Sequence, residues 1–196
     1  MKKLIVEKIA RIIPIKAKLS KELDVEIKNM GKEVYIEGDP EKEHLAEQVI
    51  DAIDMGFPIN EALLLKEEEE FMMEIINIKD YSKKDNLERV RGRIIGRDGK
   101  TLRVLSDLTG CFYELKNNKV AIIGETDKIK AAQRGIISLI QGSKQANVYS
   151  YLEKHQPEPV LDLGIKDSFK KKLKSGVTED SQEDLDEDLE EDEEEN

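Results

Sequence analysis

Along the first 155 residues, hydrophobic residues recur either at every second position, as in strands, or every three to four positions, as in helices. The same order of such segments occurs twice. In the second copy, Leu87–Arg93 alternates crudely and predicts a strand, whereas Lys100–Leu108 carries leucines at helical spacing. Cys111–Leu115 and Val120–Ile123 predict two further strands joined by a polar turn. Asp127–Gln141 carries one apolar stripe, which predicts an amphipathic helix. The predicted order is β-α-α-β-β-α.

The first copy repeats this order in its letters. Val25–Asn29 and Glu33–Gly38 parallel the two later strands of the second copy, and the helix that follows them is expected at Pro40–Asp54. Upstream, Arg11-Ile12-Ile13 occupies the place of Arg93-Ile94-Ile95. A period of about 85 residues indicates a duplicated domain, because solenoid repeats are shorter.

The pattern therefore predicts a mixed α/β (α+β) fold of two tandem units. We expect the first unit at 1–56, a connector with a helix and a strand at 57–85, the second unit at 86–158, and a tail at 159–196. From Thr178 to Asn196 the tail has thirteen Asp or Glu and no Lys or Arg. With so few apolar residues it cannot offset the entropy lost on ordering, so we expect it to be disordered.

Charge and composition narrow the class of protein. The net charge is −11, and without the thirteen acidic residues of the tail it is about +2 (−11 + 13), so the folded part is near neutral. A single cysteine, Cys111, excludes a disulfide framework within the chain. No segment is apolar and long enough for a membrane span, and the N-terminus does not resemble a signal peptide. We therefore expect a cytoplasmic protein.

The segment with chemical content is Arg91–Leu102, which reads Arg-Gly-Arg-Ile-Ile-Gly-Arg-Asp-Gly-Lys-Thr-Leu. Gly96 and Gly99 let the backbone approach a phosphodiester, because they carry no Cβ. The helix that begins at Lys100 would point its free N–H groups and positive dipole end at the same phosphates. Six basic and two acidic residues lie between Glu88 and Arg103, a local excess of positive charge. The pattern predicts a clamp for single-stranded nucleic acid, with Ile94 and Ile95 as an apolar wall for splayed bases.

Other sites are less well supported. Gly99-Lys100-Thr101 matches the end of a phosphate-binding P-loop, but that motif needs a glycine at position 94, which is Ile94. A two-metal nuclease needs clustered carboxylates on rigid elements, whereas the acidic residues here fall on helix faces and in the tail. Cys111 has no histidine near it and is expected to be a small core residue. We expect no catalytic residues, no metal and no cofactor.

The first copy lacks the clamp. Between its Arg-Ile-Ile and Leu-Ser landmarks lie only five residues, Pro14–Lys18, without glycine. The second copy has nine residues between the same landmarks, 96–104, including both glycines. The first unit is therefore expected to be degenerate: it retains the scaffold but lacks the loop.

The second unit resembles the C-terminal K-homology (KH) domain of a ribosome-assembly family of archaea and eukaryotes, known as the partner of the Nob endonuclease. The resemblance rests on Arg91–Thr101, Leu108–Gly110, Val120–Gly124, Val148–Glu153 and the connector Met55–Leu65. It covers about residues 3–158, and it implies two tandem type I KH domains, each β-α-α-β-β-α.

The resemblance implies a non-enzymatic factor that binds the 3′-terminal region of small-subunit ribosomal RNA during its maturation. Partners implied with it are the Nob endonuclease and a translation initiation factor subunit or a dimethylating enzyme. The residues that match the family's RNA clamp are Gly96, Arg97, Asp98, Gly99 and Lys100, with Arg91, Arg93 and Arg103 as flanking contacts. Two alternatives stay open, a KH-fold protein-interaction scaffold and a general RNA-binding protein without a ribosomal role.

Overall fold

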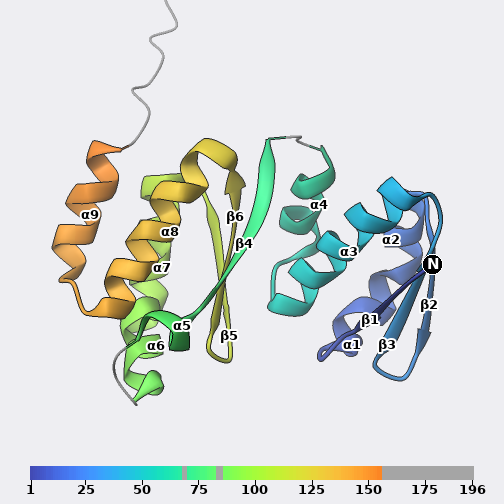
Figure 1. Ribbon diagram of the computed structural model, residues 1–196, viewed down its shortest axis with the longest axis horizontal. Helices are drawn as coiled ribbons and strands as arrows, with labels where there is room; N and C mark the ends of the chain where they lie inside the picture. Colours follow the sequence, from blue (N-terminus) through green and yellow to red (C-terminus); the bar gives the residue numbers. More distant parts are fainter. Residues whose placement is uncertain (68–69, 83–85, 156–196) are drawn as a thin grey trace, which may run out of the picture. The chain divides into compact units, whose positions relative to one another are not determined.

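Two three-stranded antiparallel sheets organise the computed structural model, which describes residues 1–67, 70–82 and 86–155 (Figure 1). The described residues fall within one compact unit, Met1–Gln156. The mixed α/β fold predicted from the sequence is confirmed. The expected disorder of 159–196 concerns residues that lie outside the described part of the chain.

The first repeat forms a sheet in the order β1-β3-β2, with every neighbouring pair antiparallel. The helix expected at Pro40–Asp54 is present and ends one residue later, where Gly56 at φ 140° stops it. The elements are β1 (Lys2–Ile5), α1 (Ile9–Ile12), the 3₁₀ turn η1 (Ile13–Ile15), α2 (Lys16–Leu23), β2 (Glu26–Met30), β3 (Glu33–Glu37) and α3 (Pro40–Met55).

The second repeat forms a sheet in the order β4-β6-β5, again antiparallel, and α6, α7 and α8 lie on one side of it (Figure 1). Helix α4 precedes this repeat and α9 follows it. The elements are α4 (Ile59–Glu67), β4 (Phe71–Asn77), α5 (Ile78–Tyr81), α6 (Leu87–Ile95), the 3₁₀ turn η2 (Arg97–Gly99), α7 (Lys100–Thr109), β5 (Phe112–Lys116), β6 (Lys119–Glu125), α8 (Thr126–Gln141) and α9 (Gln145–Lys154).

The strand predicted at Leu87–Arg93 is wrong, because this segment is helix α6. Its N-terminus is capped by the Asn86 side chain, which accepts a hydrogen bond from the Arg89 N–H at 3.0 Å. Val90 and Ile94, four residues apart, are the buried residues of the helix. The prediction failed because arginines occur at every second position, 89, 91 and 93, which gives this segment the two-residue period of a strand.

The first strand of the second sheet is β4, which falls in the range expected as a connector. β4 pairs along its whole length with β6, from Phe71 opposite Glu125 to Asn77 opposite Lys119. Its side chains alternate between two sides: Phe71 and Met73 pack on one cluster of buried residues, Met72 and Ile76 on the other. The segment is therefore part of the second sheet.

Both faces of this sheet are covered by helices. On β6, Val120 and Ile122 belong to the core shared with α6, α7 and α8. Ala121 and Ile123, which point the other way, belong to the core that contains the buried residues of α3 and α4. All four are fully buried. The two repeats therefore share apolar packing through one strand.

A buried ion pair also joins the two repeats. The Lys116 ammonium at the end of β5 lies 2.6 Å from Asp54 of α3 and 2.9 Å from Glu7. The Lys116 side chain is only 9% exposed. Burial alone would lower the pKa of Lys116, but the hydrogen bonds to Asp54 and Glu7 outweigh it and raise the pKa above its ordinary value.

Helix α9 is an addition to the six-element order. A Cβ placed on Gly135 of α8 would lie 3.4 Å from the side chains of Val148 and Leu152, so the two helices pack closely there. In the part of the chain that the structure describes, no helix combines the length and apolarity needed to cross a membrane.

Candidate nucleic-acid interface

The loop between α6 and α7 has a backbone that only a glycine-rich sequence adopts easily. Gly96 ends α6 at φ 75° and ψ 178°, and Gly99 stands before α7 at φ 74°. Asp98, between them, is left-handed at φ 54°. Asp and Asn tolerate this region better than most residues. The turn bends the chain directly into α7, which begins at Lys100 as predicted.

The two glycines serve different purposes. A Cβ on Gly96 would lie 2.1 Å from Thr101 Oγ1 and 2.8 Å from the Thr101 backbone nitrogen, so this position is closed by the protein itself. A Cβ on Gly99 would meet no atom within 4 Å. Gly99 therefore leaves open space beside the loop, through which a ligand backbone can approach.

Alanine at Gly96 should destabilise the protein more than alanine at Gly99. Each change places a Cβ at positive φ, which costs about 1–2 kcal/mol, and only the first adds a collision with Thr101. The Gly99→Ala melting temperature should fall by roughly 2–4 °C per kcal/mol, and that of Gly96→Ala by at least about twice as much. Thermal unfolding followed by circular dichroism measures both. Equal losses would contradict the closed-versus-open assignment.

The charged side chains on the loop are free to meet an anion. Arg97, Lys100 and Arg103 are exposed, and none of them forms an ion pair with a carboxylate in residues 1–67, 70–82 or 86–155. No side chain caps α7, because its N-cap is Gly99. The Lys100 N–H donates to the Arg97 carbonyl within the 3₁₀ turn, and no side chain covers the helix start beside these exposed cations, a combination typical of phosphate binding at helix N-termini.

Two of the expected flanking arginines are already engaged. Arg91 donates through Nη1 to the Asn117 carbonyl at 3.3 Å, across to the turn between β5 and β6. Arg93 donates through Nη2 to the carbonyls of Gly142 at 3.0 Å and of Ser143. Arg93 therefore fastens the end of α8, and Arg91 lies between the loop and the β5–β6 turn.

The two isoleucines before the loop do not behave alike. Ile94 is 0% exposed and packs in the core of the second repeat, so its side chain does not form the apolar wall expected of it. Helical geometry places it on the buried face with Val90, four residues earlier. Ile95 is half-buried and is the one of the pair whose side chain reaches the surface.

Helix α9 holds the residues on both sides of the loop through hydrogen bonds. Gln145, the first residue of α9, donates through Nε2 to Thr101 Oγ1 at 2.8 Å and to the Arg93 carbonyl at 3.2 Å. Thr101 is itself only 3% exposed. Sequence reasoning missed Gln145, and a lone glutamine 44 residues from Thr101 carries no signal that could have revealed it.

Cys111 has the structural role predicted for it. The residue is fully buried, and burial raises the pKa of its thiol. Its sulfur lies so close to Gly124 of β6 that a Cβ there would approach it to 2.5 Å. A buried, protonated thiol in a tight contact is a packing residue rather than a nucleophile.

Part of this chain matches a protein-family model, and a larger part is similar to a curated protein. Residues 72–157 match the family model described as eukaryotic type KH-domain (KH-domain type I). KH domain-containing protein MJ0443 of Methanocaldococcus jannaschii is 34% identical over 149 residues, which are 72% of this chain and 65% of that protein. Pre-rRNA-processing protein PNO1 of Yarrowia lipolytica is 35% identical, over 52% of this chain and 40% of its own length. The chain thus spans less than two thirds of these curated relatives.

Solved structures agree over a larger share of the fold. Dim2p from Pyrococcus horikoshii superimposes with a TM-score of 0.72 at 32% identity, covering 78% of this chain and 98% of that chain. An a/eIF2alpha–aDim2p–rRNA complex from the same organism contains a chain with the same TM-score and identity, 92% of which is covered. Protein APE0754 of Aeropyrum pernix also gives 0.72, at 26% identity, over 89% of this chain and 96% of its own.

Proposed function

Because this chain belongs to the KH-domain family of archaeal Dim2p and eukaryotic PNO1, we propose that it binds single-stranded RNA as a factor in small-subunit ribosome assembly. The proposed target is the 3′-terminal region of the small-subunit ribosomal RNA during its maturation. The factor binds and positions RNA, and it catalyses no step itself. The cytoplasm is the compartment expected for this work.

The observation that carries the proposal is the loop Gly96–Lys100. KH domains hold about four nucleotides by their backbone at such a Gly-x-x-Gly loop. Here the open side of Gly99, the exposed Arg97 and Lys100, which pair with no carboxylate among the described residues, and the start of α7 without a side-chain cap follow one another within five residues. The proposed RNA contacts are Gly96, Arg97, Asp98, Gly99, Lys100 and Arg103, with Ile95 and Arg91 beside them. Arg93 and Ile94 support the loop from within.

The division of labour between the repeats is part of the proposal. We assign 1–56 to a degenerate KH unit and extend the second unit back to β4, since that strand completes its sheet. In the first repeat, α1 and α2 are joined by the 3₁₀ turn Ile13–Ile15, which contains Pro14 and no glycine. Because the N-cap of α2 is Ile15 and not a glycine, we assign this repeat a packing and protein-docking role.

Protein partners follow from the relatives. The structure of the Pyrococcus horikoshii protein with a/eIF2alpha and rRNA supports a translation initiation factor subunit as a partner of this chain too. The second proposed partner is the Nob endonuclease, since the family that the second unit resembles is known as the partner of that enzyme. Both proposals concern surfaces other than the loop, which RNA would occupy.

The salt dependence of RNA binding tests the proposal. A clamp that neutralises three or four phosphates of a single strand should give a slope of log K against log salt of about −2 to −3. We expect this slope with short single-stranded RNA in fluorescence anisotropy, and much weaker binding to a perfect RNA duplex. A protein-interaction scaffold would bind neither RNA, and a slope near −8 would mean a much longer RNA track than this loop.

A further inference from the structure

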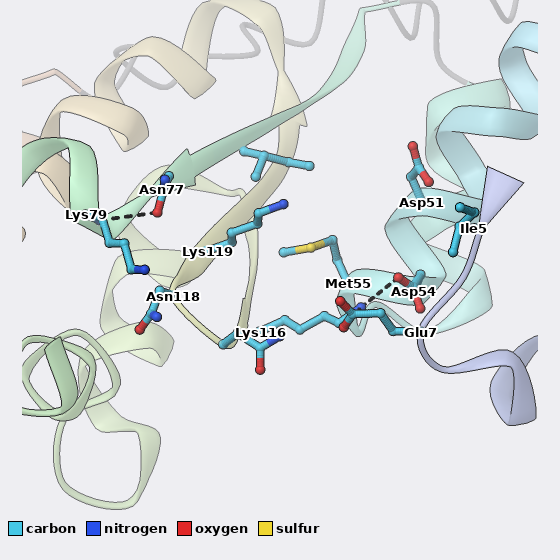
Figure 2. A pocket seen from close by; sticks show the side chains of 12 residues that line it. Ile5, Glu7, Asp51, Asp54, Met55, Asn77, Lys79, Lys116, Asn118 and Lys119 are labelled. Carbon is cyan, nitrogen blue, oxygen red and sulfur yellow. Dashed lines mark hydrogen bonds and ion pairs between the residues drawn. The ribbon is translucent and has the colours of Figure 1, made fainter. Parts of the chain in front are cut away.

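A cavity of about 480 Å³ lies between α3 and β1 of the first repeat and the β4 and β5–β6 strands of the second (Figure 2). Its size falls within the roughly 300–1,000 Å³ typical of small-ligand sites. It is separate from the Gly96–Lys100 loop, since no residue of that loop lines it. The proposed RNA clamp therefore does not involve the side chains that line this cavity.

The polar groups of this cavity sit on opposite walls. Figure 2 shows Lys79, Asn118 and Lys119 on the side of the second sheet and Asp51 on the side of α3. Neither Lys79 nor Lys119 pairs with a carboxylate among the residues that the structure describes, and Asp51 has no hydrogen-bond partner among them. Lys116, in contrast, is already neutralised by Asp54 and Glu7.

The charges favour a ligand with two different ends. Three lysines and three carboxylates line the cavity, so its walls have no net charge and give no general preference for an anion. Among the described residues, Lys79 and Lys119 offer donors without a carboxylate partner on one side, and Asp51 offers an acceptor without a hydrogen bond on the other. Burial, followed by the charges of Glu47 and Asp54, raises the pKa of Asp51, although Lys116 and Lys119 act in the opposite direction.

Each wall also carries apolar surface. Ile5 of β1 is 75% exposed and Ile75 of β4 is 43% exposed, and both line the cavity with the buried Met55. These are among the few large hydrophobic side chains that the described residues leave exposed. A flat ring between them would cover this surface while its polar edges reached the two walls.

The cavity is next to the proposed RNA path. Asn117, at the tip of the β5–β6 turn, lines the cavity. Its carbonyl also accepts the hydrogen bond from Arg91 of α6, the helix that leads into the loop. We therefore expect a strand that leaves the loop along Arg91 to reach the rim of the cavity at Asn117.

We propose that this cavity binds one further nucleotide of the same RNA strand, with guanosine preferred. Lys79 and Lys119 contact its phosphate, its base packs against Ile5 and Ile75, and Asp51 accepts hydrogen bonds from the base edge. A carboxylate accepts two hydrogen bonds side by side, and guanine presents two adjacent donors, N1–H and its amino group. Adenine, cytosine and uracil present one donor group on that edge. This inference rests on the proposed RNA-binding function and extends it.

RNA length separates the cavity from the clamp. The full-length chain is titrated by fluorescence anisotropy with a four-nucleotide RNA, then with RNAs lengthened by single uridines at either end, and finally with one guanosine moved through the extension. We expect one end and one position at which guanosine strengthens binding at least about tenfold over uridine. The four-nucleotide RNA should not respond to changes in the cavity.

Two variants test the roles proposed for Asp51 and Lys119. Asp51→Asn removes a negative charge, so a purely electrostatic effect would strengthen the binding of every RNA, including the four-nucleotide one. The proposal instead predicts loss of the guanosine preference, with binding of the four-nucleotide RNA unchanged. Lys119→Ala should weaken binding of the extended RNA alone. Lys130→Ala, an exposed lysine on α8 outside the cavity, is the matched control. Circular dichroism and thermal melts verify that each variant is folded.

The outcomes are distinct. If the four-nucleotide RNA binds but no extension or guanosine position adds affinity, the cavity proposal is overturned and the clamp stands. If the guanosine preference survives Asp51→Asn, or Lys130→Ala matches Lys119→Ala, the assignment of these residues is overturned. If no single-stranded RNA binds at all, the proposed function fails and this inference fails with it.

Discussion

Replacing Arg97 with aspartate should lower the affinity for single-stranded RNA at least tenfold, about 1.4 kcal/mol. The side chain is exposed on the open side of the Gly96–Lys100 loop and pairs with no described carboxylate. The change places a second carboxylate beside Asp98, so phosphates would meet repulsion in place of attraction. Because no packing is lost, the circular dichroism spectrum and melting temperature should stay as in the wild type. Anisotropy titration at low salt measures the effect.

The control must carry the same change in charge. Arg134→Asp on α8 is suitable, because Arg134 is also exposed and forms no ion pair with a described residue. If both variants lost the same affinity, the effect would be general electrostatics and the loop would not be the clamp. Arg97→Lys should retain most binding if a point charge suffices, and lose part of it if the planar guanidinium holds a phosphate with two hydrogen bonds.

Replacing Lys116 with methionine should destabilise the whole protein. Removing one partner of a fully buried ion pair costs roughly 3–5 kcal/mol, because the other charge stays behind without compensation. Lys116 is 9% exposed and Asp54 15% exposed, but Glu7 is largely exposed, so we expect a smaller loss than for a fully buried pair, about 2 kcal/mol. Urea unfolding monitored by circular dichroism measures the loss.

Charge compensation and pH distinguish the ion pair from simple packing. Adding Asp54→Asn to Lys116→Met should recover part of the loss, and Lys119→Met should be nearly neutral because Lys119 is exposed and unpaired with a described carboxylate. The pKa of Lys116 is raised above the ordinary 10.5. Its contribution is therefore complete below pH 10.5 and disappears as the pH rises through the higher folded value. A wild type without this alkaline loss would contradict the ion-pair role.

Local patterns in the sequence predicted much of the fold. The helices at Pro40–Met55 and Thr126–Gln141 came from apolar stripes, and the start of α7 at Lys100 came from the preceding glycine. The strands β5 and β6 came from short apolar runs around a polar turn. In each case the information lies within a window of a few turns of chain, where periodicity and capping determine structure.

Features that depend on distant parts of the chain were missed. α6 was predicted as a strand because Arg89, Arg91 and Arg93 alternate, whereas burial of Val90 and Ile94 against α8 decides its conformation. Nothing in the letters of 71–77 identifies β6 as the partner of β4, since register comes from tertiary packing. The positioning of Thr101 by Gln145 likewise exists only once α9 has folded back.

Strand β6 limits how this protein can be divided into stable fragments. Its side chains contribute to the cores on both faces of one sheet, so a fragment starting at β4 would expose Ala121, Ile123, Phe71, Met73 and Phe112. Such a contiguous apolar patch promotes association rather than solubility. The duplicated motif thus forms one compact unit within residues 1–156, in which the first repeat covers apolar residues of the second sheet. Damage in α3 would therefore reach RNA binding through the abundance of folded protein, without altering any group near the loop.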